Sequence, residues 1–148
     1  MKQEILIVDD QRDICEIIAE ILQDQGYATR SSLASDQALE QLSIKKPALV
    51  ILDVWLNDNR FDGIELLDII KQHHPTLPVV MMSGHGTIQM ALDAVKRGAY
   101  DFLEKPFKTD RLLSIVQKAI QEAQLRWELE DIKRNSFYHL EFIGISSW

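Results

Sequence analysis

The sequence has one cysteine, four prolines and six glycines among its 148 residues, and it has no excess of positive charge. The single cysteine, Cys15, excludes an internal disulfide, and the isoleucines around it at helical spacing indicate simple packing rather than redox chemistry. So few prolines and glycines are typical of an ordinary folded chain, and not of a fibrous or disordered one. The formal net charge of -7 argues against a broad binding surface for DNA, RNA or anionic membranes, since these polyanions would be repelled.

Long hydrophobic runs are also missing. The first apolar run, residues 5–8, ends at two aspartates, whereas a secretory signal needs roughly 7–15 apolar residues. No segment approaches the roughly 18 consecutive apolar residues of a membrane span. We therefore expect a cytoplasmic protein without a membrane segment. The length suits one globular domain with a short appendage.

Five short apolar runs alternate with segments of helical periodicity. We predict strands at residues 5–8, 28–31, 48–54, 78–82 and 99–103. We predict helices at residues 12–25, 36–43, 63–73, 87–97 and 109–134. The first, third and fourth runs are apolar almost throughout, as parallel strands covered on both faces must be. The pattern predicts an α/β fold with a doubly wound five-stranded parallel sheet, whose functional crevice lies at the carboxyl ends of the strands.

The last predicted helix is longer than the sheet requires. Apolar residues recur in it at alternating spacings of three and four, the pattern of a short coiled-coil seam: Leu113, Val116, Ile120, Ala123 and Trp127. For the first half of the helix, packing of one amphipathic face on its own domain is an equally good interpretation. We expect a folded domain in residues 1–122, a helical linker in residues 123–135, and a tail in residues 136–148 that begins a further module.

Polar and charged residues close four of the predicted strands. Asp9 and Asp10 follow the first strand, Asp53 ends the third, Ser83 follows the fourth and Lys105 follows the fifth. These strand ends meet at one edge of a parallel sheet, where three ionised carboxylates repel one another unless a hard cation such as Mg²⁺ lies between them. We expect Asp10 to bind the metal directly and Asp9 to bind it through water.

This arrangement predicts phosphoryl chemistry. A metal at the carboxylates would bring a phosphate group to Asp53, which then acts as the nucleophile. Lys105 would serve as a fixed cation, and Ser83 as a hydrogen-bond donor to the phosphoryl oxygens. Each residue alone has an ordinary explanation, because aspartates after strands often cap helices and a lone serine or lysine is usually solvated. Their joint presence at four strand ends favours a functional site.

Four blocks of the sequence resemble the signature blocks of response-regulator receiver domains. They are residues 8–10 (VDD), 52–53 (LD), 82–85 (MSGH) and 98–107 (GAYDFLEKPF). Their wording is most similar to the NtrC and NtrX group of transcriptional activators, and the resemblance covers about residues 3 to 122. It implies a flavodoxin-like (βα)5 fold with strand order 2-1-3-4-5, and an Asp53 that is phosphorylated by a partner histidine kinase.

The resemblance also implies individual roles at the site. Asp9 and Asp10 match the acidic metal residues, and the main-chain carbonyl of Trp55 matches a further Mg²⁺ ligand. Ser83 and Lys105 match the hydroxyl and the lysine of the family.

The resemblance implies two further features near the end of the fifth strand. Phe102 occupies the position of an aromatic switch in this family, although an ordinary core aromatic is an equally good interpretation. The Lys105-Pro106 bond is expected to be cis. One departure concerns the loop after the phosphoacceptor, where the family's common proline is replaced by Asn57 and residues 57–60 make the loop about two residues longer.

Three other functions compete with a phosphorylated receiver. An aspartate-nucleophile phosphatase needs a carboxylate two residues after the nucleophile, and that position is Trp55. We therefore expect that the chain is not an enzyme, except that it catalyses its own phosphorylation and dephosphorylation. Trp55 and His85 border the acceptor and either control the loss of the phosphoryl group or form an inert wall.

A nucleotide-binding domain would place a loop rich in glycine, serine or threonine where this chain has Asp9, Asp10 and Asp13. The third alternative is a phosphorylation-independent dimerisation scaffold.

The expected output is a change of partners. Ser83 and Lys105 would draw toward the phosphoryl oxygens and shift an existing equilibrium on the face formed by the fourth helix, fifth strand and fifth helix. A homodimer would form through this face and the helical extension. Residues 141–144 (EFIG) resemble the entry to the ATPase module of this family. This resemblance implies a sigma-54-dependent activator of nitrogen regulation, which would reach DNA and the sigma-54 polymerase through domains outside this chain.

Overall fold

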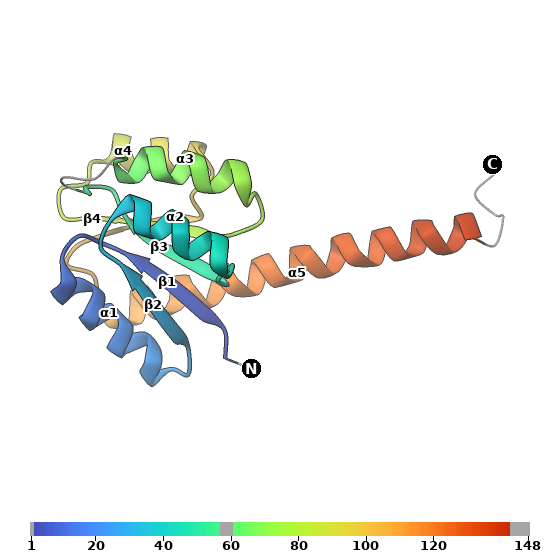
Figure 1. The fold of residues 1–148 in the computed structure, drawn as a ribbon, viewed down its shortest axis with the longest axis horizontal. Helices are drawn as coiled ribbons and strands as arrows, with labels where there is room; N and C mark the ends of the chain where they lie inside the picture. Colours follow the sequence, from blue (N-terminus) through green and yellow to red (C-terminus); the bar gives the residue numbers. More distant parts are fainter. Residues whose placement is uncertain (1, 57–60, 143–148) are drawn as a thin grey trace.

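The structure, a computed structural model, describes residues 2–56 and 61–142, and in them five strands alternate with five helices (Figure 1). The strands are β1 (Glu4–Val8), β2 (Ala28–Ser32), β3 (Leu49–Asp53), β4 (Val79–Ser83) and β5 (Asp101–Glu104). The helices are α1 (Arg12–Asp24), α2 (Ser35–Ile44), α3 (Gly63–His73), α4 (Ile88–Lys96) and α5 (Thr109–Phe142). The predicted alternation is confirmed, with most boundaries shifted by one or two residues.

All neighbouring strands are parallel, and their order is β2-β1-β3-β4-β5. The inner strands β1, β3 and β4 are buried along almost their whole length, whereas the edge strands β2 and β5 are partly exposed. Burial on both faces explains why the inner strands are apolar at nearly every position. The strand order that the resemblance implied is confirmed, and it puts the switch point of the sheet between β1 and β3.

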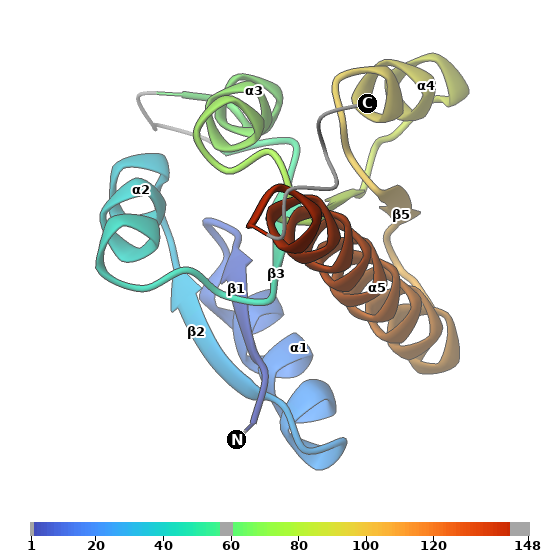
Figure 2. The same ribbon diagram turned by 90° about the vertical axis from the view of Figure 1, so that its right-hand side faces the viewer.

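The helices lie in two layers, one on each face of the sheet (Figure 2). Helices α2, α3 and α4 cover one face and form a shared core that includes Leu6 and Val8 of β1. Helices α1 and α5 cover the other face and form a second core that includes Ile5 and Ile7 of β1. Successive side chains of a strand point to opposite faces, so a single strand supplies both cores.

The start of α3 is fixed tightly against the end of β3. The Asp62 carboxylate accepts a hydrogen bond from the Glu65 N–H at 2.8 Å, and the Glu65 carboxylate accepts one from the Asp62 N–H at 3.3 Å, which forms a capping box. At Gly63 a Cβ atom would overlap the main-chain carbonyl of Asp53, so only glycine allows this approach. The lengthened loop predicted at residues 57–60 lies outside the described residues.

Helix α5 has 34 residues and projects well beyond the sheet (Figure 1). It continues to Phe142, so the predicted end near Arg134 is wrong. Residues 135–142 contain no proline or glycine, and aromatic residues disfavour a helix only slightly. The division into residues 1–122, 123–135 and 136–148 stays a prediction, and residues 143–148 lie outside the described part.

The first half of α5 packs on its own domain, as one of the two interpretations had it. Leu112, Val116 and Ala119 are almost completely buried against the sheet. Across the described residues, we find no helix with the length and apolar character needed to cross a membrane.

Cys15 on α1 is buried, and its Sγ lies 3.4 Å from the main-chain carbonyl oxygen of Asp9, to which it donates a hydrogen bond. Burial, together with the negative charge of Asp9, raises the pKa of the Cys15 thiol to about 11. The thiol therefore stays protonated at neutral pH, and the predicted packing role agrees with this environment.

Candidate functional site

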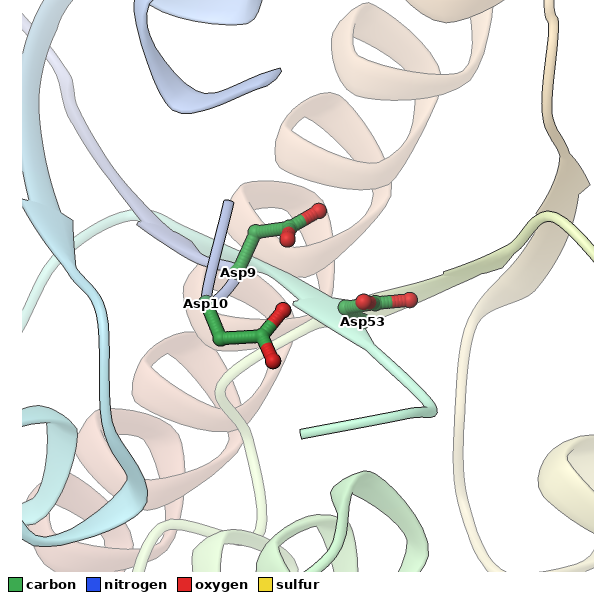
Figure 3. Close-up of side chains that lie close together, drawn as sticks. All are labelled: Asp9, Asp10 and Asp53. Carbon is green, nitrogen blue, oxygen red and sulfur yellow. The ribbon is translucent and has the colours of Figure 1, made fainter. Parts of the chain in front are cut away.

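Three aspartates from two strand ends come together at the carboxyl edge of the sheet (Figure 3). Asp9 and Asp10 follow β1, and Asp53 is the last residue of β3. One carboxylate oxygen from each residue lies within 4.8 Å of the other two. Asp9 and Asp53 are buried, while Asp10 is partly exposed. The predicted acidic cluster is thus assembled by the fold.

Lys105, directly after β5, brings a positive charge to this cluster. Its ammonium group lies 2.8 Å from Asp9 Oδ2 and 3.6 Å from Asp53 Oδ1. The other oxygen of Asp9 accepts a hydrogen bond from the main-chain N–H of Gln11 at 2.9 Å. Asp9 therefore has a partner for each oxygen, whereas Asp53 Oδ1 is buried and has no hydrogen-bond partner among the described residues.

The environment of Asp53 opposes its ionisation. Burial is the largest cause and the charge of Asp9 the next, and together they raise the pKa of the Asp53 carboxyl from 3.8 to about 6. The positive charge of Lys105 and the main-chain N–H of Trp55 act in the opposite direction. At neutral pH the ionised carboxylate is present but under-stabilised, so a further cation at this position would be favourable.

The acidic cluster suits a hard divalent cation. Its donors are carboxylate oxygens alone, which Mg²⁺ prefers over nitrogen or sulfur ligands. The buried Asp53 oxygen without a hydrogen-bond partner among the described residues is the observation that a metal there would explain. The residues present therefore fit a magnesium ion.

Ser83 ends β4 and is completely buried beside the cluster. Its hydroxyl oxygen accepts a hydrogen bond from the main-chain N–H of His85 at 3.1 Å, and its carbonyl accepts one from the N–H of Lys105 at 2.8 Å. A hydroxyl that accepts in this way keeps its own proton for donation. The β4–β5 pairing thus holds Ser83 and Lys105 side by side at the edge of the sheet.

An open pocket of about 460 Å³ reaches Asp53 and Lys105 at this edge of the sheet. Its lining residues are Asp10, Gln11, Asp53, Trp55, Gly84, His85 and Lys105. Trp55 is 48% exposed, and His85 is exposed as well, so both stand at the rim. The predicted border of Trp55 and His85 is found at the pocket, and Asp53 is among the residues that line it.

Phe102 on β5 is partly buried against the core under α2, α3 and α4. The edge of its ring lies against Gly86 in the loop between β4 and α4, where a Cβ atom would come within 2.7 Å of Phe102 Cε1. The Lys105-Pro106 bond is cis, as expected. Phe102 is thus a packed aromatic in contact with the loop that follows Ser83.

Sequence reasoning missed three contributions to the site. Gln11 acts through its main-chain N–H, which carries no signal in the residue type. Gly63 and Gly86 matter because the Asp53 carbonyl and the Phe102 ring come close to them, and only the three-dimensional packing reveals such contacts.

The model of the response regulator receiver domain family matches residues 5–117. The chain is 49% identical over 147 residues to the nitrogen assimilation regulatory protein NtrX of Azorhizobium caulinodans, a match that covers 99% of this chain and 32% of that protein. It is 42% identical to a putative NtrX-like response regulator of Rickettsia bellii, covering 97% of this chain and 30% of that protein. The chain thus spans about a third of the length of the curated relatives it matches.

Solved structures agree with these sequence matches. The crystal structure of the NtrX receiver domain from Brucella abortus has a TM-score of 0.77 and 52% identity, and the match covers 79% of this chain and 98% of that one. The solution structure of the beryllofluoride-activated NtrC4 receiver domain dimer has a TM-score of 0.76 and 34% identity, covering 81% and 98%. The chain therefore belongs to the response regulator receiver domain family, the phosphoacceptor modules of two-component signalling, and is similar to NtrX and NtrC.

Proposed function

We propose that Asp53 accepts a phosphoryl group from the phosphohistidine of a sensor histidine kinase. The observation that carries the proposal is the buried Asp53 carboxylate, which lies in a cluster with the carboxylates of Asp9 and Asp10, has Lys105 beside it and lines an open pocket. In the transfer an Asp53 oxygen forms a bond to phosphorus while the bond from phosphorus to the histidine nitrogen breaks, and the electron pair returns to the imidazole.

The residues around Asp53 have separate tasks in this proposal. Asp9, Asp10, Asp53 and the Trp55 main-chain carbonyl would hold Mg²⁺, which supplies positive charge between the phosphoryl oxygens and the carboxylates. Lys105 stabilises charge on the phosphoryl oxygens. The Ser83 hydroxyl donates a hydrogen bond to one of those oxygens. The acidic cluster is of the kind at which receiver domains hold Mg²⁺, which supports this assignment.

The phosphorylated form would persist as a signal. An aspartyl-phosphate is hydrolysed quickly when a carboxylic acid or base activates water next to it. Two residues after Asp53 stands Trp55, whose indole supplies neither. The chain would catalyse only its own phosphorylation and dephosphorylation.

The output would act through the face of α4, β5 and α5. Helix α4 exposes Ile88, Leu92 and Val95 at spacings of four and three, which makes an apolar stripe suited to a partner. Ser83 precedes α4 in the chain, and Lys105 directly follows β5. A movement of these two residues toward the phosphoryl oxygens would therefore shift the position of α4 and β5. Phosphorylation would thereby alter a homodimer, and the dimer formed by the beryllofluoride-activated NtrC4 receiver domain, a similar protein, supports this expectation.

The whole protein would be an NtrX-like, sigma-54-dependent transcriptional activator of nitrogen regulation. The support is the similarity to NtrX and NtrC proteins of about three times this length. Contacts with DNA and the sigma-54 polymerase would come from domains outside this chain, whose net charge of -7 disfavours DNA binding. The cytoplasmic location stays a prediction.

Phosphorylation-dependent association tests this output against the scaffold alternative. Sedimentation velocity of the chain would be compared with and without acetyl phosphate and Mg²⁺, alongside the Asp53→Asn variant. We expect the association state of the wild type to change with phosphorylation and that of the variant to stay fixed. If both proteins associate equally under all conditions, the scaffold alternative is correct. Truncation at about residue 122 tells whether the extension takes part.

A further inference from the structure

Two serines near the carboxyl end of β2 are completely buried. Ser32 is the last residue of β2, and Ser35 is the first residue of α2. The Ser35 hydroxyl oxygen accepts a hydrogen bond from the main-chain N–H of Phe61 at 3.2 Å. The Ser32 hydroxyl has no hydrogen-bond partner among the described residues. The two serines are thus equally buried but differ in their contact with the chain that follows β3.

The hydrogen bond between Ser35 and Phe61 is not the usual cap of a helix end. A capping serine accepts a hydrogen bond from an N–H group in the first turn of its own helix. Phe61 instead lies 26 residues after Ser35 in the chain. The N-cap residue of α2 is Ala34, whose side chain has no hydrogen-bonding group. The contact therefore joins two separate parts of the fold.

Phe61 belongs to a segment that is held closely against the end of β3. It is followed by Asp62, the N-cap residue of α3, and by Gly63. The Gly63 N–H donates a hydrogen bond to the Val54 carbonyl at 2.9 Å. A Cβ atom at Gly63 would overlap the main-chain carbonyl of Asp53. Through Phe61, the Ser35 hydroxyl is therefore connected to the strand end that carries the proposed phosphoacceptor.

The segment between β2 and α2 is also joined to the end of β1. Val8 of β1 pairs with Ser32, and the next N–H along the chain, that of Asp9, donates a hydrogen bond to the Ser32 carbonyl at 3.1 Å. Asp10 follows, and its carboxylate points toward Asp53 (Figure 3). Residues 32–35 thus connect the strand end with Asp10 to the chain that follows Asp53.

Trp55 lies on the far side of this connection. Its neighbours Val54 and Leu56 are buried in the core, whereas its own side chain is exposed. Trp55 lines the same pocket as Asp10 and Asp53. The position of its main-chain carbonyl depends on how residues 54–56 are held, and Val54 is bonded to Gly63, two residues after Phe61.

We propose that Ser35 is a positioning residue for the magnesium site, because its hydrogen bond to Phe61 holds the chain around Trp55 in place relative to Asp10. The inference rests on the proposed function, in which Asp10 and the Trp55 carbonyl bind Mg²⁺. This ion requires a narrow range of ligand geometry. Groups that hold its ligands in place from outside therefore contribute to its affinity. Without the Ser35 hydroxyl, more of the ordering would have to take place when the metal binds.

Mg²⁺ affinity tests the proposal, with Ser35→Ala as the variant. Ser32→Ala is the matched control, because it removes an equally buried hydroxyl from the same segment. Mg²⁺ titrations of the 148-residue chains would be followed by tryptophan fluorescence, with Trp55 at the pocket rim. Ser35→Ala should raise the dissociation constant of Mg²⁺ by roughly three- to tenfold, the effect of one hydrogen bond. Ser32→Ala should change it by less than about twofold.

A wild-type dissociation constant in Ser35→Ala would overturn the proposal, and so would equal losses of affinity in the two variants. Ser35→Cys is a second variant, because it keeps the side chain close to its size but accepts hydrogen bonds only weakly. It should also raise the dissociation constant. Helical circular dichroism checks that all variants fold, as we expect after the loss of a single hydroxyl.

The rate of phosphorylation by acetyl phosphate separates positioning from a general loss of structure. At saturating Mg²⁺ the maximal rate of Ser35→Ala should stay within about twofold of the wild type, since Asp53 and Lys105 are unchanged. The Mg²⁺ concentration that gives half of this rate should rise by the same factor as the dissociation constant. A reduced maximal rate with an unchanged Mg²⁺ dependence would contradict a positioning role.

The two measurements also separate this inference from the proposed function. If the wild type binds Mg²⁺ but takes up no phosphate, the proposed function fails, and the Mg²⁺ titrations still decide the role of Ser35. If the wild type is phosphorylated and Ser35→Ala binds Mg²⁺ equally well, only the role of Ser35 is refuted. A wild type that does not bind Mg²⁺ would overturn both.

Discussion

The Lys105 ammonium group lies closer to Asp9 than to the proposed phosphoacceptor, at 2.8 Å from Asp9 Oδ2 against 3.6 Å from Asp53 Oδ1. The Asp9 side chain is completely buried, so this ion pair is shielded from solvent. A fixed cation at Asp9 competes with a divalent metal for the same carboxylate. At 3.6 Å from Asp53 Oδ1, the Lys105 ammonium group would also be close to the oxygens of a phosphoryl group on Asp53.

Replacement of Lys105 by methionine should therefore have opposite effects on metal binding and on phosphorylation. Loss of the positive charge should tighten Mg²⁺ binding by roughly tenfold, because the three carboxylates lose their competing partner. Phosphorylation by acetyl phosphate should slow by about 10²-fold, because a fixed donor to the phosphoryl oxygens is gone. Mg²⁺ titration followed by tryptophan fluorescence, with Trp55 at the pocket rim, measures the first effect.

Lys108→Met is the matched control for Lys105, because Lys108 is exposed and three residues further along the chain. It should leave both quantities nearly unchanged. Weaker Mg²⁺ binding in Lys105→Met than in the control would contradict the competition between the lysine and the metal.

The raised pKa of Asp53 predicts how stability depends on pH. The carboxyl holds its proton more tightly in the folded state, with a pKa of about 6, than in the unfolded state, where it is near 3.8. The stability that this group contributes is thus present below about pH 4 and is lost as the pH rises through about 6. Without Mg²⁺, Asp53→Asn should be more stable than the wild type at pH 8 by about 3 kcal/mol.

Urea unfolding of both proteins in a metal chelator, between pH 4 and pH 8, measures this difference. The difference in the free energy of unfolding should shrink to near zero at pH 4. Mg²⁺ should reduce this difference at pH 8, because the metal stabilises only the carboxylate cluster of the wild type. An asparagine variant that is less stable than the wild type at pH 8 without metal would refute the assigned burial effect.

Gly86 should be intolerant of a side chain because of Phe102. A Cβ atom at this position would lie 2.7 Å from Phe102 Cε1 and 2.9 Å from Cζ. Gly86→Ala should therefore displace the ring or the loop and lower the free energy of unfolding by about 1–3 kcal/mol. Gly84→Ala is the control, since a Cβ atom there has nothing within 4 Å. Equal losses in the two variants would mean that the Phe102 contact is not the cause.

Much of the fold could be predicted because its inner strands leave a strong sequence signal. In β1, β3 and β4 apolar residues follow one another without alternating with polar ones. This pattern is typical of parallel strands in a sheet that is covered on both faces. The same topology brought Asp9, Asp53, Ser83 and Lys105 to one edge, so the members of the site followed from the strand ends alone.

The sequence could not predict how these groups pair or where α5 ends. Asp9 and Asp53 are both candidates for Lys105, and a difference of 0.8 Å between the two distances depends on the exact course of β5. Apolar spacing in α5 is the same whether a face packs on the sheet or on a second chain. The burial of Leu112, Val116 and Ala119 shows that the first half of α5 packs on the sheet.

The most direct test of the central claim is the intact mass of the chain after incubation with acetyl phosphate and Mg²⁺, measured on the wild type and on Asp53→Asn. We predict that the wild type gains one phosphate only when Mg²⁺ is present, that hydroxylamine removes it as expected for an acyl phosphate, and that the variant gains none. The same gain in Asp53→Asn, or no gain in the wild type from either acetyl phosphate or a cognate kinase, would contradict Asp53 as the phosphoacceptor.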